Sequence, residues 1–197
     1  METKQQRTAD LILAGARASF AADGYGATSL SAVARAAGTS KQVVLHHFRS
    51  KERLYLTVLA SVQDELTSWI EAVDAVGNDP TDQLWRLIGR LLEAENQQMV
   101  LLTLRALLEV EASSPVTSNW PLKPFVERLR AFAAAASSGE RAAEARAFAM
   151  VYGLLGSVSY YLISRETLIG MYGADAHLEM EDCFKQEVRS RLENLKR

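Results

Sequence analysis

The chain has 197 residues, of which 48% are hydrophobic and 23% charged, and its formal net charge is −2. This composition excludes a largely disordered chain, and the length suits one domain or two small ones. The single cysteine, Cys183, excludes an intramolecular disulfide bond and favours a reducing, cytoplasmic setting.

The charge is unevenly distributed along the chain. Residues 1–56 carry eight Lys or Arg and four Asp or Glu, a balance of +4 that leaves −6 for the rest. A basic N-terminal region on an acidic body indicates that this region alone meets a polyanion. A chance fluctuation is the alternative, since the excess is only four charges.

Three short helices are predicted at the N-terminus. Leu13, Ala16 and Phe20 share one face of a first helix that ends near Gly24. Helices over 30–37 and 41–47 follow, and the turn between them contains a helix-breaking glycine and residues suited to capping the next helix.

Helical periodicity continues through the rest of the chain. A fourth helix over 51–76 carries one apolar stripe, formed by Leu54, Val58, Val62, Leu66, Trp69 and Val73. Further helices are predicted near 84–91, 100–107, 121–132, 140–164 and 176–196, with a connecting segment that ends at Gly173. No strand alternation longer than a few residues occurs, so we predict an all-α fold of about nine helices.

The second and third helices form a predicted helix-turn-helix. In such a unit the second helix enters the DNA major groove, led by its N-terminal residues. Here Lys41 can donate to guanine, Gln42 can pair with adenine and Val43 can contact a thymine methyl. Hydroxyls and cations at nearby helix starts suit phosphates. The predicted DNA-binding residues are Thr28, Ser29, Ser40, Lys41, Gln42, Val43, His46, His47, Arg49 and Lys51.

A pattern of residues at fixed spacing runs through 11–54. It comprises Ile12, Ala16, Phe20, Gly24-Tyr25, Thr28-Ser29-Leu30, Val33-Ala34, Ala36-Ala37-Gly38, Ser40-Lys41, His46, Phe48, Ser50-Lys51-Glu52 and Leu54. This segment resembles the head of the TetR family of bacterial transcriptional regulators, while the body is similar only in its helical character. The resemblance implies a homodimeric DNA-binding regulator with a ligand pocket in the body. It divides the chain into a helix-turn-helix DNA-binding domain, 1–50, and a helical ligand-binding and dimerisation domain, 51–197.

The third helix departs from the family pattern at three positions. Gln42, Val43 and Leu45 stand where the family usually has a small residue, Thr and Tyr. Leu45 has no hydroxyl to offer a phosphate, and His47 is the candidate donor in its place. The operator sequence and the phosphate contacts of the family are therefore not carried over to this chain.

The helix over 140–164 carries small residues that permit close approach of another helix. With the last helix it is expected to form half of a four-helix interface in a symmetric dimer, as the resemblance also implies. Packing within the chain is the alternative. The predicted interface residues are Ala149, Gly153, Gly156, Ser157, Tyr160, Phe184 and Val188.

A ligand pocket is predicted among large side chains of the body, with plain core packing as the alternative for each aromatic residue. Arg105 either pairs with Glu109 at the surface, which we favour, or anchors an acidic ligand. The candidate lining residues are Trp69, Trp85, Met99, Arg105, Phe125, Phe148 and Tyr152.

Other classes of site find little support. No phosphate-binding glycine loop or catalytic motif occurs, so neither an enzyme nor a cofactor is predicted. His46 and His47 point about 100° apart on a helix, so one metal ion would not bind both, and no metal site is predicted. The uncharged segment 147–164 reaches the minimum membrane-spanning length, but we favour a buried helix. Cys183 is expected in the core, and His177 in a surface pair with Glu181.

We therefore predict a cytoplasmic, ligand-responsive transcriptional regulator. In this hypothesis a homodimer binds a palindromic operator in double-stranded DNA as a repressor, and an unidentified small molecule releases it. The alternatives are a helical ligand-binding or enzymatic protein whose head only resembles a DNA reader, and a nucleoid protein with little sequence preference.

Overall fold

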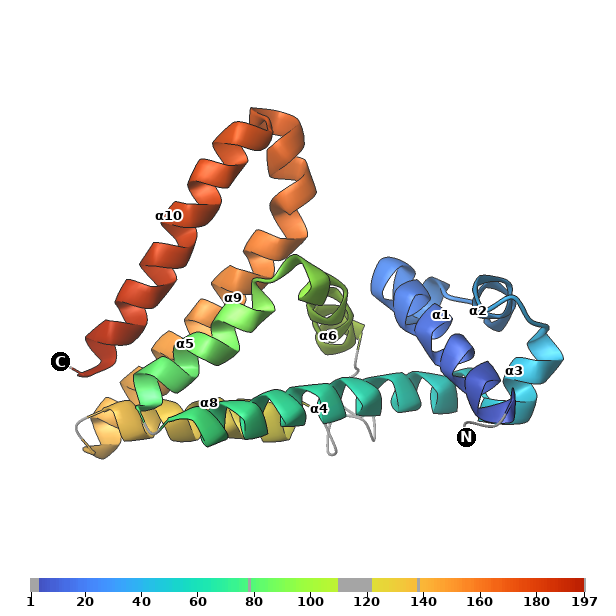
Figure 1. The fold of residues 1–197 in the computed structure, drawn as a ribbon, viewed down its shortest axis with the longest axis horizontal. Helices are drawn as coiled ribbons and strands as arrows, with labels where there is room; N and C mark the ends of the chain where they lie inside the picture. The colour runs from blue at the N-terminus through green and yellow to red at the C-terminus, as the bar shows by residue number, and fades with distance from the viewer. Residues whose placement is uncertain (1–3, 78, 110–121, 138, 197) are drawn as a thin grey trace. The chain divides into compact units, whose positions relative to one another are not determined.

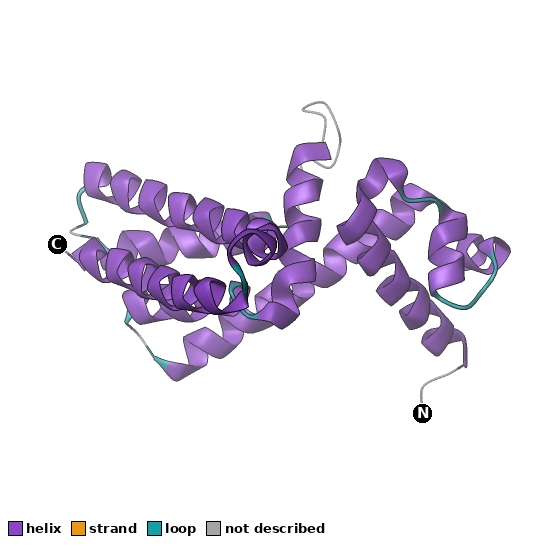
Figure 2. Ribbon diagram, turned by 90° about the horizontal axis from the view of Figure 1, so that it is seen from above, coloured by secondary structure: helices purple, strands orange, loops and turns teal. Residues whose placement is uncertain are grey.

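The computed structural model describes residues 4–77, 79–109, 122–137 and 139–196. These residues form nine α-helices and no strands, so the predicted all-α fold is confirmed (Figures 1 and 2). The helices are α1 (Lys4–Ala27), α2 (Leu30–Ala36), α3 (Lys41–Phe48), α4 (Lys51–Val76), α5 (Pro80–Leu91), α6 (Gln97–Glu109), α8 (Lys123–Ala136), α9 (Arg141–Tyr172) and α10 (Ala174–Glu193). The 3-10 turns η1 (Ala94–Asn96) and η2 (Asn194–Lys196) complete the described structure.

The chain forms two compact units. The first unit comprises Met1–Glu65 and Gln98–Pro121, and the second comprises Leu66–Gln97 and Leu122–Arg197. Helix α4 contributes residues to both units. The functional division expected at residue 50 stays a prediction.

The first unit is built on a small apolar core between α1, α2 and α3. The side chains of Phe20, Val33 and Val44 are fully buried there. Gly15 lets α1 approach α2 closely, because a Cβ at this position would lie 3.3 Å from the Cβ of Ala36. Packing of this core, rather than the propensity of such short helices, holds α2 and α3 in place.

Polar contacts tie the longer helices of the first unit to α1. The Arg17 guanidinium forms a 2.9 Å ion pair with Glu65 on α4. From α6, Arg105 donates a 2.6 Å hydrogen bond to the carbonyl of Ala22. Ala22 lies two residues before Gly24, where α1 is kinked, and a cation interacts favourably with carbonyls at the end of a helical segment.

The second unit is a layer of packed helices in which α5 contacts α8, α8 contacts α9 and α9 contacts α10. Its core is aliphatic and aromatic, formed by Leu84, Leu87, Ile88, Leu129, Phe132, Val151, Leu154 and Val158. The last turns of α4 are attached through Arg128, which donates at 2.6 Å to the Asp74 carboxylate.

Helix α9 is longer than predicted. The expected connecting segment after Ser164 is helical and continues to Tyr172, because no proline interrupts it and the first residue with a positive φ is Gly173 (φ 88°). Among the described residues, α9 alone is long and apolar enough to cross a membrane, with a mean hydropathy of 1.4. One such helix is weak evidence for a membrane span. Pro121, predicted near the start of α8, lies outside the described residues.

Two expectations for α10 are wrong. His177 is buried, and its Nε2 lies 3.3 Å from the Tyr161 hydroxyl, while Glu181 instead accepts hydrogen bonds from Tyr161 and Lys185. The bond from Lys185 lowers the pKa of Glu181, and burial raises the pKa of the Tyr161 hydroxyl above its usual value. Cys183 is exposed on α10 and is not part of the core.

The kink in α1 generates a stability prediction. Gly24 has φ 78° and ψ 173°, a conformation almost restricted to glycine. Gly24→Ala is therefore expected to lower the free energy of unfolding by about 1–3 kcal/mol in chemical denaturation. Gly26→Ala is the matched control, because a Cβ there meets no atom within 4 Å and the residue has no positive φ. Equal stability of the two variants would contradict this account of the kink.

Candidate nucleic-acid interface

The turn between α2 and α3 is stabilised by local hydrogen bonds. The hydroxyls of Ser29 and Ser40 accept from the backbone N–H groups of Ala32 and Val43, at 3.1 and 3.3 Å, and so cap the two helices. Gly38 adopts φ 63° between them, and the Thr39 N–H bonds the Ala34 carbonyl at 2.8 Å. The predicted helix-turn-helix is confirmed in its geometry.

Helix α3 has one buried face and one exposed face. Val44 is fully buried, whereas Lys41, Gln42 and His46 are exposed. Val43, Leu45 and His47 are half-buried along the border between the two faces. The helix therefore presents Lys41 and Gln42 to solvent from its first turn, where a recognition helix carries its base-reading side chains.

The start of α4 adds cations beside α3. Ser50 caps this helix by accepting from the Arg53 N–H at 3.1 Å. Lys51 donates to the Gly26 carbonyl at 3.2 Å and its Nζ lies 4.4 Å from the centroid of the Tyr25 ring. These contacts hold the ammonium group in one place and leave two of its N–H groups for an anion.

A basic concavity lies between the end of α3 and the first turns of α4. Its volume is about 410 Å³, and its lining includes the exposed cations Arg49 and Arg53. The remaining lining residues are His47, Phe48 and Thr57. Sequence reasoning missed Arg53, although its place in the first turn of a capped helix, two residues after Lys51, was the available signal.

The assignment of Thr28 to DNA needs correction. Its side chain is 2% exposed, and its hydroxyl lies 2.7 Å from the Gly24 carbonyl and 3.1 Å from that of Ser19. The hydroxyl thus satisfies carbonyls at the kink of α1 and does not reach solvent.

Comparison with known proteins shows what this region is similar to. Residues 12–58 match the bacterial regulatory proteins of the tetR family. The match covers α2, α3, most of α1 and the start of α4.

Solved structures match the fold over nearly the whole chain. A transcriptional regulator from Rhodococcus sp. Rha1 is 19% identical with a TM-score of 0.69, covering 98% of this chain and 96% of that one. A TetR-family transcriptional regulator from Bordetella parapertussis 12822 is 21% identical, with a TM-score of 0.67 and coverages of 91% and 93%. A fatty acid degradation regulator from Bacillus halodurans is 19% identical, with a TM-score of 0.63 and coverages of 95% and 93%. No curated protein sequence matches significantly.

The chain therefore has the fold of TetR-family transcriptional regulators.

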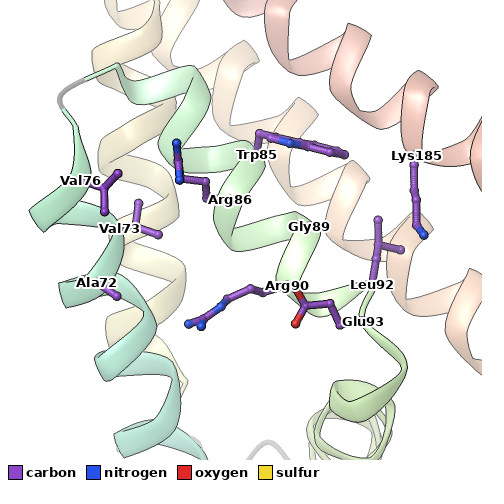
Figure 3. Close-up of a pocket in the computed structure, with 10 residues that line it drawn as sticks. All are labelled: Ala72, Val73, Val76, Trp85, Arg86, Gly89, Arg90, Leu92, Glu93 and Lys185. Carbon is purple, nitrogen blue, oxygen red and sulfur yellow. The ribbon is translucent and has the colours of Figure 1, made fainter.

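The structure does not bring the predicted ligand-pocket residues together in one place. Trp85 lines a cavity of about 520 Å³ in the second unit (Figure 3). Trp69, Met99 and Phe125 are buried.

Three further pocket candidates lie elsewhere. Phe148 is half-buried. Tyr152 is 62% exposed, so the prediction that it lines a pocket is wrong, and it lies on the surface of α9. Arg105 belongs to the first unit and donates to the Ala22 carbonyl. The side chain of its expected partner Glu109 lies outside the described part of the chain, so that pair stays a prediction.

The predicted dimer residues fall on one side of α9 and α10 with one exception. Ala149, Gly153, Gly156 and Tyr160 are exposed, and Ser157 and Phe184 are half-buried. Val188 is 1% exposed and belongs to the core of the second unit. The prediction that it lies in an interface between copies is therefore wrong.

The burial of Thr28 generates a prediction for this tetR-family region. Thr28→Val keeps the shape of the side chain and removes the hydroxyl, so the free energy of unfolding is expected to fall by about 1–2 kcal/mol. The salt dependence of DNA binding is expected to stay unchanged, because no phosphate contact is lost.

Thr103→Val is the matched control, since the hydroxyl of Thr103 bonds the Val100 carbonyl within α6 and the residue does not line the basic concavity. Denaturation and salt titrations of DNA binding measure the two effects. If Thr28→Val reduces the salt slope of DNA binding and leaves the stability unchanged, Thr28 contacts a phosphate and this account is wrong.

Proposed function

We propose that this protein is a cytoplasmic homodimeric transcriptional repressor that a small molecule releases from a palindromic operator. The observation that carries the proposal is the exposure of Lys41 and Gln42 on the first turn of α3, within a tetR-family DNA-binding region. TetR-family regulators are generally not enzymes, and we propose no catalytic role.

Two kinds of DNA contact follow from the site. Gln42 has the amide donor and acceptor that pair with adenine, and Lys41 has the donors that bind guanine. Lys51, Arg49 and Arg53 are expected to contact phosphates, because they surround the capped N-terminus of α4. Phosphate contacts position the protein on the duplex, while α3 reads the sequence.

This division of roles is tested with two variants. Lys51→Ala is expected to weaken binding to every duplex and to reduce the salt slope by about one. Gln42→Ala is expected to cost about 1–3 kcal/mol on the operator and to relax the preference at one base pair. Fluorescence anisotropy on operator and random duplexes measures both. If Gln42→Ala weakens binding to random DNA equally, Gln42 does not read a base.

The exposed side of α9 and α10 supports a dimer. A groove of about 660 Å³ runs between these helices, lined by small residues of α9 and by Met180 and Phe184 of α10. Tyr152, Tyr160 and Ile163 are each more than half exposed on α9. Apolar surface gathered on one side of a helix pair fits a second copy of the same pair related by two-fold symmetry.

Gly153→Arg tests this interface. A Cβ at Gly153 meets no atom within 4 Å, so the protomer can accommodate the arginine while an apposed copy cannot. We expect monomers in analytical ultracentrifugation with unchanged helical content by circular dichroism. Gly77→Arg is the control, because that glycine is equally open but lies outside α9 and α10. A folded wild-type monomer at micromolar concentration would contradict the dimer.

A single helix offers a route for ligand-driven release. Helix α4 runs without interruption from Lys51 to Val76, and its last turns line the cavity of about 520 Å³ through Ala72, Val73 and Val76. A ligand that displaces this end of the helix is expected to displace the end that carries Lys51. For release, the ligand must bind the displaced form more tightly than the DNA-binding form.

The coupling is measured with a compound found by thermal-shift screening. Its affinity is expected to fall in the presence of operator DNA by the same factor by which it weakens operator binding, about 5- to 150-fold for a coupling of about 1–3 kcal/mol. The double variant Ala60→Gly with Ser61→Gly should soften α4 and reduce this factor with ligand affinity nearly unchanged. Equal ligand affinities with and without operator would exclude release by that compound.

Two alternatives predict different DNA binding. A helical ligand-binding or enzymatic protein has no affinity for either duplex, and a nucleoid protein binds operator and random DNA equally. The proposed repressor binds the operator more tightly, and the difference persists as salt weakens both.

A further inference from the structure

The cavity in the second unit combines an apolar wall with cationic side chains. Val73 and Val76 of α4 line it on one side of α5, and the Trp85 ring extends from α5 on the other side, towards α10 (Figure 3). The charged lining residues are Arg86, Arg90, Glu93 and Lys185. The volume of about 520 Å³ lies in the range of small-molecule sites.

Two of the three cations already have carboxylate partners. Arg86 forms a 2.6 Å ion pair with Asp82, one turn earlier on α5. Lys185 of α10 forms a 2.5 Å ion pair with Glu181. Neither cation needs a ligand to balance its charge.

Arg90 differs from both of them. It is half-buried, and within the described part of the chain its guanidinium forms no ion pair. The guanidinium carbon lies 5.1 Å from the centroid of the Trp69 ring. Figure 3 shows the side chain extending from α5 towards α4, on the side of Ala72 and Val73.

The acidic residue of the lining, Glu93, forms no ion pair with Arg90. Glu93 is exposed, and its carboxylate accepts a 3.3 Å hydrogen bond from the side-chain amide of Asn96. That amide also donates to the Arg90 carbonyl at 2.8 Å, which holds it next to Glu93. Arg90 therefore lines the cavity with no carboxylate of the described residues within ion-pair distance of its guanidinium.

We propose that this cavity binds a small organic carboxylate with an apolar body, and that Arg90 binds the carboxylate group. A guanidinium stacked on an aromatic ring keeps its edge available for a bidentate pair with a carboxylate. One unpaired cation matches a single negative charge, which favours a monoanionic carboxylate over a dianionic phosphate. The apolar body then lies against the apolar side chains of α4 that line the cavity, Ala72, Val73 and Val76.

This inference rests on the proposed function, because it names the chemical class of the effector for the same cavity. It follows that neutral molecules of the same shape bind more weakly, and that cationic ones are repelled by Arg90.

The test is calorimetric titration of the full chain with two matched pairs of probes: octanoate with octanamide, and naphthalene-2-carboxylate with naphthalene-2-carboxamide. At least one carboxylate is expected to bind about tenfold or more tightly than its amide. The two pairs differ in their apolar body, which is a flexible chain in the first and a flat aromatic system in the second. If neither carboxylate binds more tightly than its amide, the proposal is wrong.

Variants then assign the effect to Arg90. Arg90→Gln is expected to remove the preference for the carboxylate and leave amide binding unchanged. Arg90→Lys keeps the charge and should retain part of the preference. Arg191→Gln is the matched control on α10, since its partner is Glu187 and it does not line the cavity. A preference that survives in folded Arg90→Gln protein would overturn the role of Arg90.

The same titrations in the presence of operator DNA separate this inference from the proposed function. Carboxylate binding that depends on Arg90 but does not change operator affinity supports the site and contradicts ligand-driven release. Release by a compound that binds independently of Arg90, with no carboxylate preference, supports the repressor and overturns the carboxylate site.

Discussion

The buried stripe of α4 is the constraint on which the rest of the structure depends. Leu54, Val58, Val62, Leu66, Trp69 and Val73 recur at helical spacing and are each at most 7% exposed. Because the stripe is continuous, one helix supplies core residues to both compact units. Its ends differ in chemistry: the first turn carries Lys51 and a capped N-terminus, and the last turns line a cavity. In the proposed mechanism, α4 is therefore the element that couples ligand binding to DNA binding.

The features predicted correctly from the sequence are those decided by local chemistry. The caps at Ser29 and Ser40, the positive φ of Gly38 and the stripe of α4 follow from residue type and spacing alone. The tetR-family pattern is spread over the same elements, so the helix-turn-helix and the exposure of Lys41 and Gln42 followed from the sequence as well.

The features that were missed depend on contacts between residues far apart in the chain. Thr28 looked like a phosphate ligand beside Ser29, but the kink at Gly24 turns its hydroxyl towards carbonyls of α1. Arg105 was compared with Glu109 and with an acidic ligand, but its hydrogen bond to the carbonyl of Ala22, 83 residues away, was not foreseen. His177 was paired with Glu181 by spacing, while packing against Tyr161 buries it. Helical periodicity identifies a buried face but does not say which distant side chain meets it.

Selection of bound duplexes from a random DNA pool tests the central claim most directly. If two copies of α3 read DNA through Lys41 and Gln42, the selected sequences should converge on a palindrome. Its half-sites should be separated by about one helical turn or a small multiple of it. The selected duplex should bind about 10³-fold or more tightly than random DNA at the same salt concentration. No enrichment over the starting pool, with equal affinity for selected and random duplexes, would contradict the account.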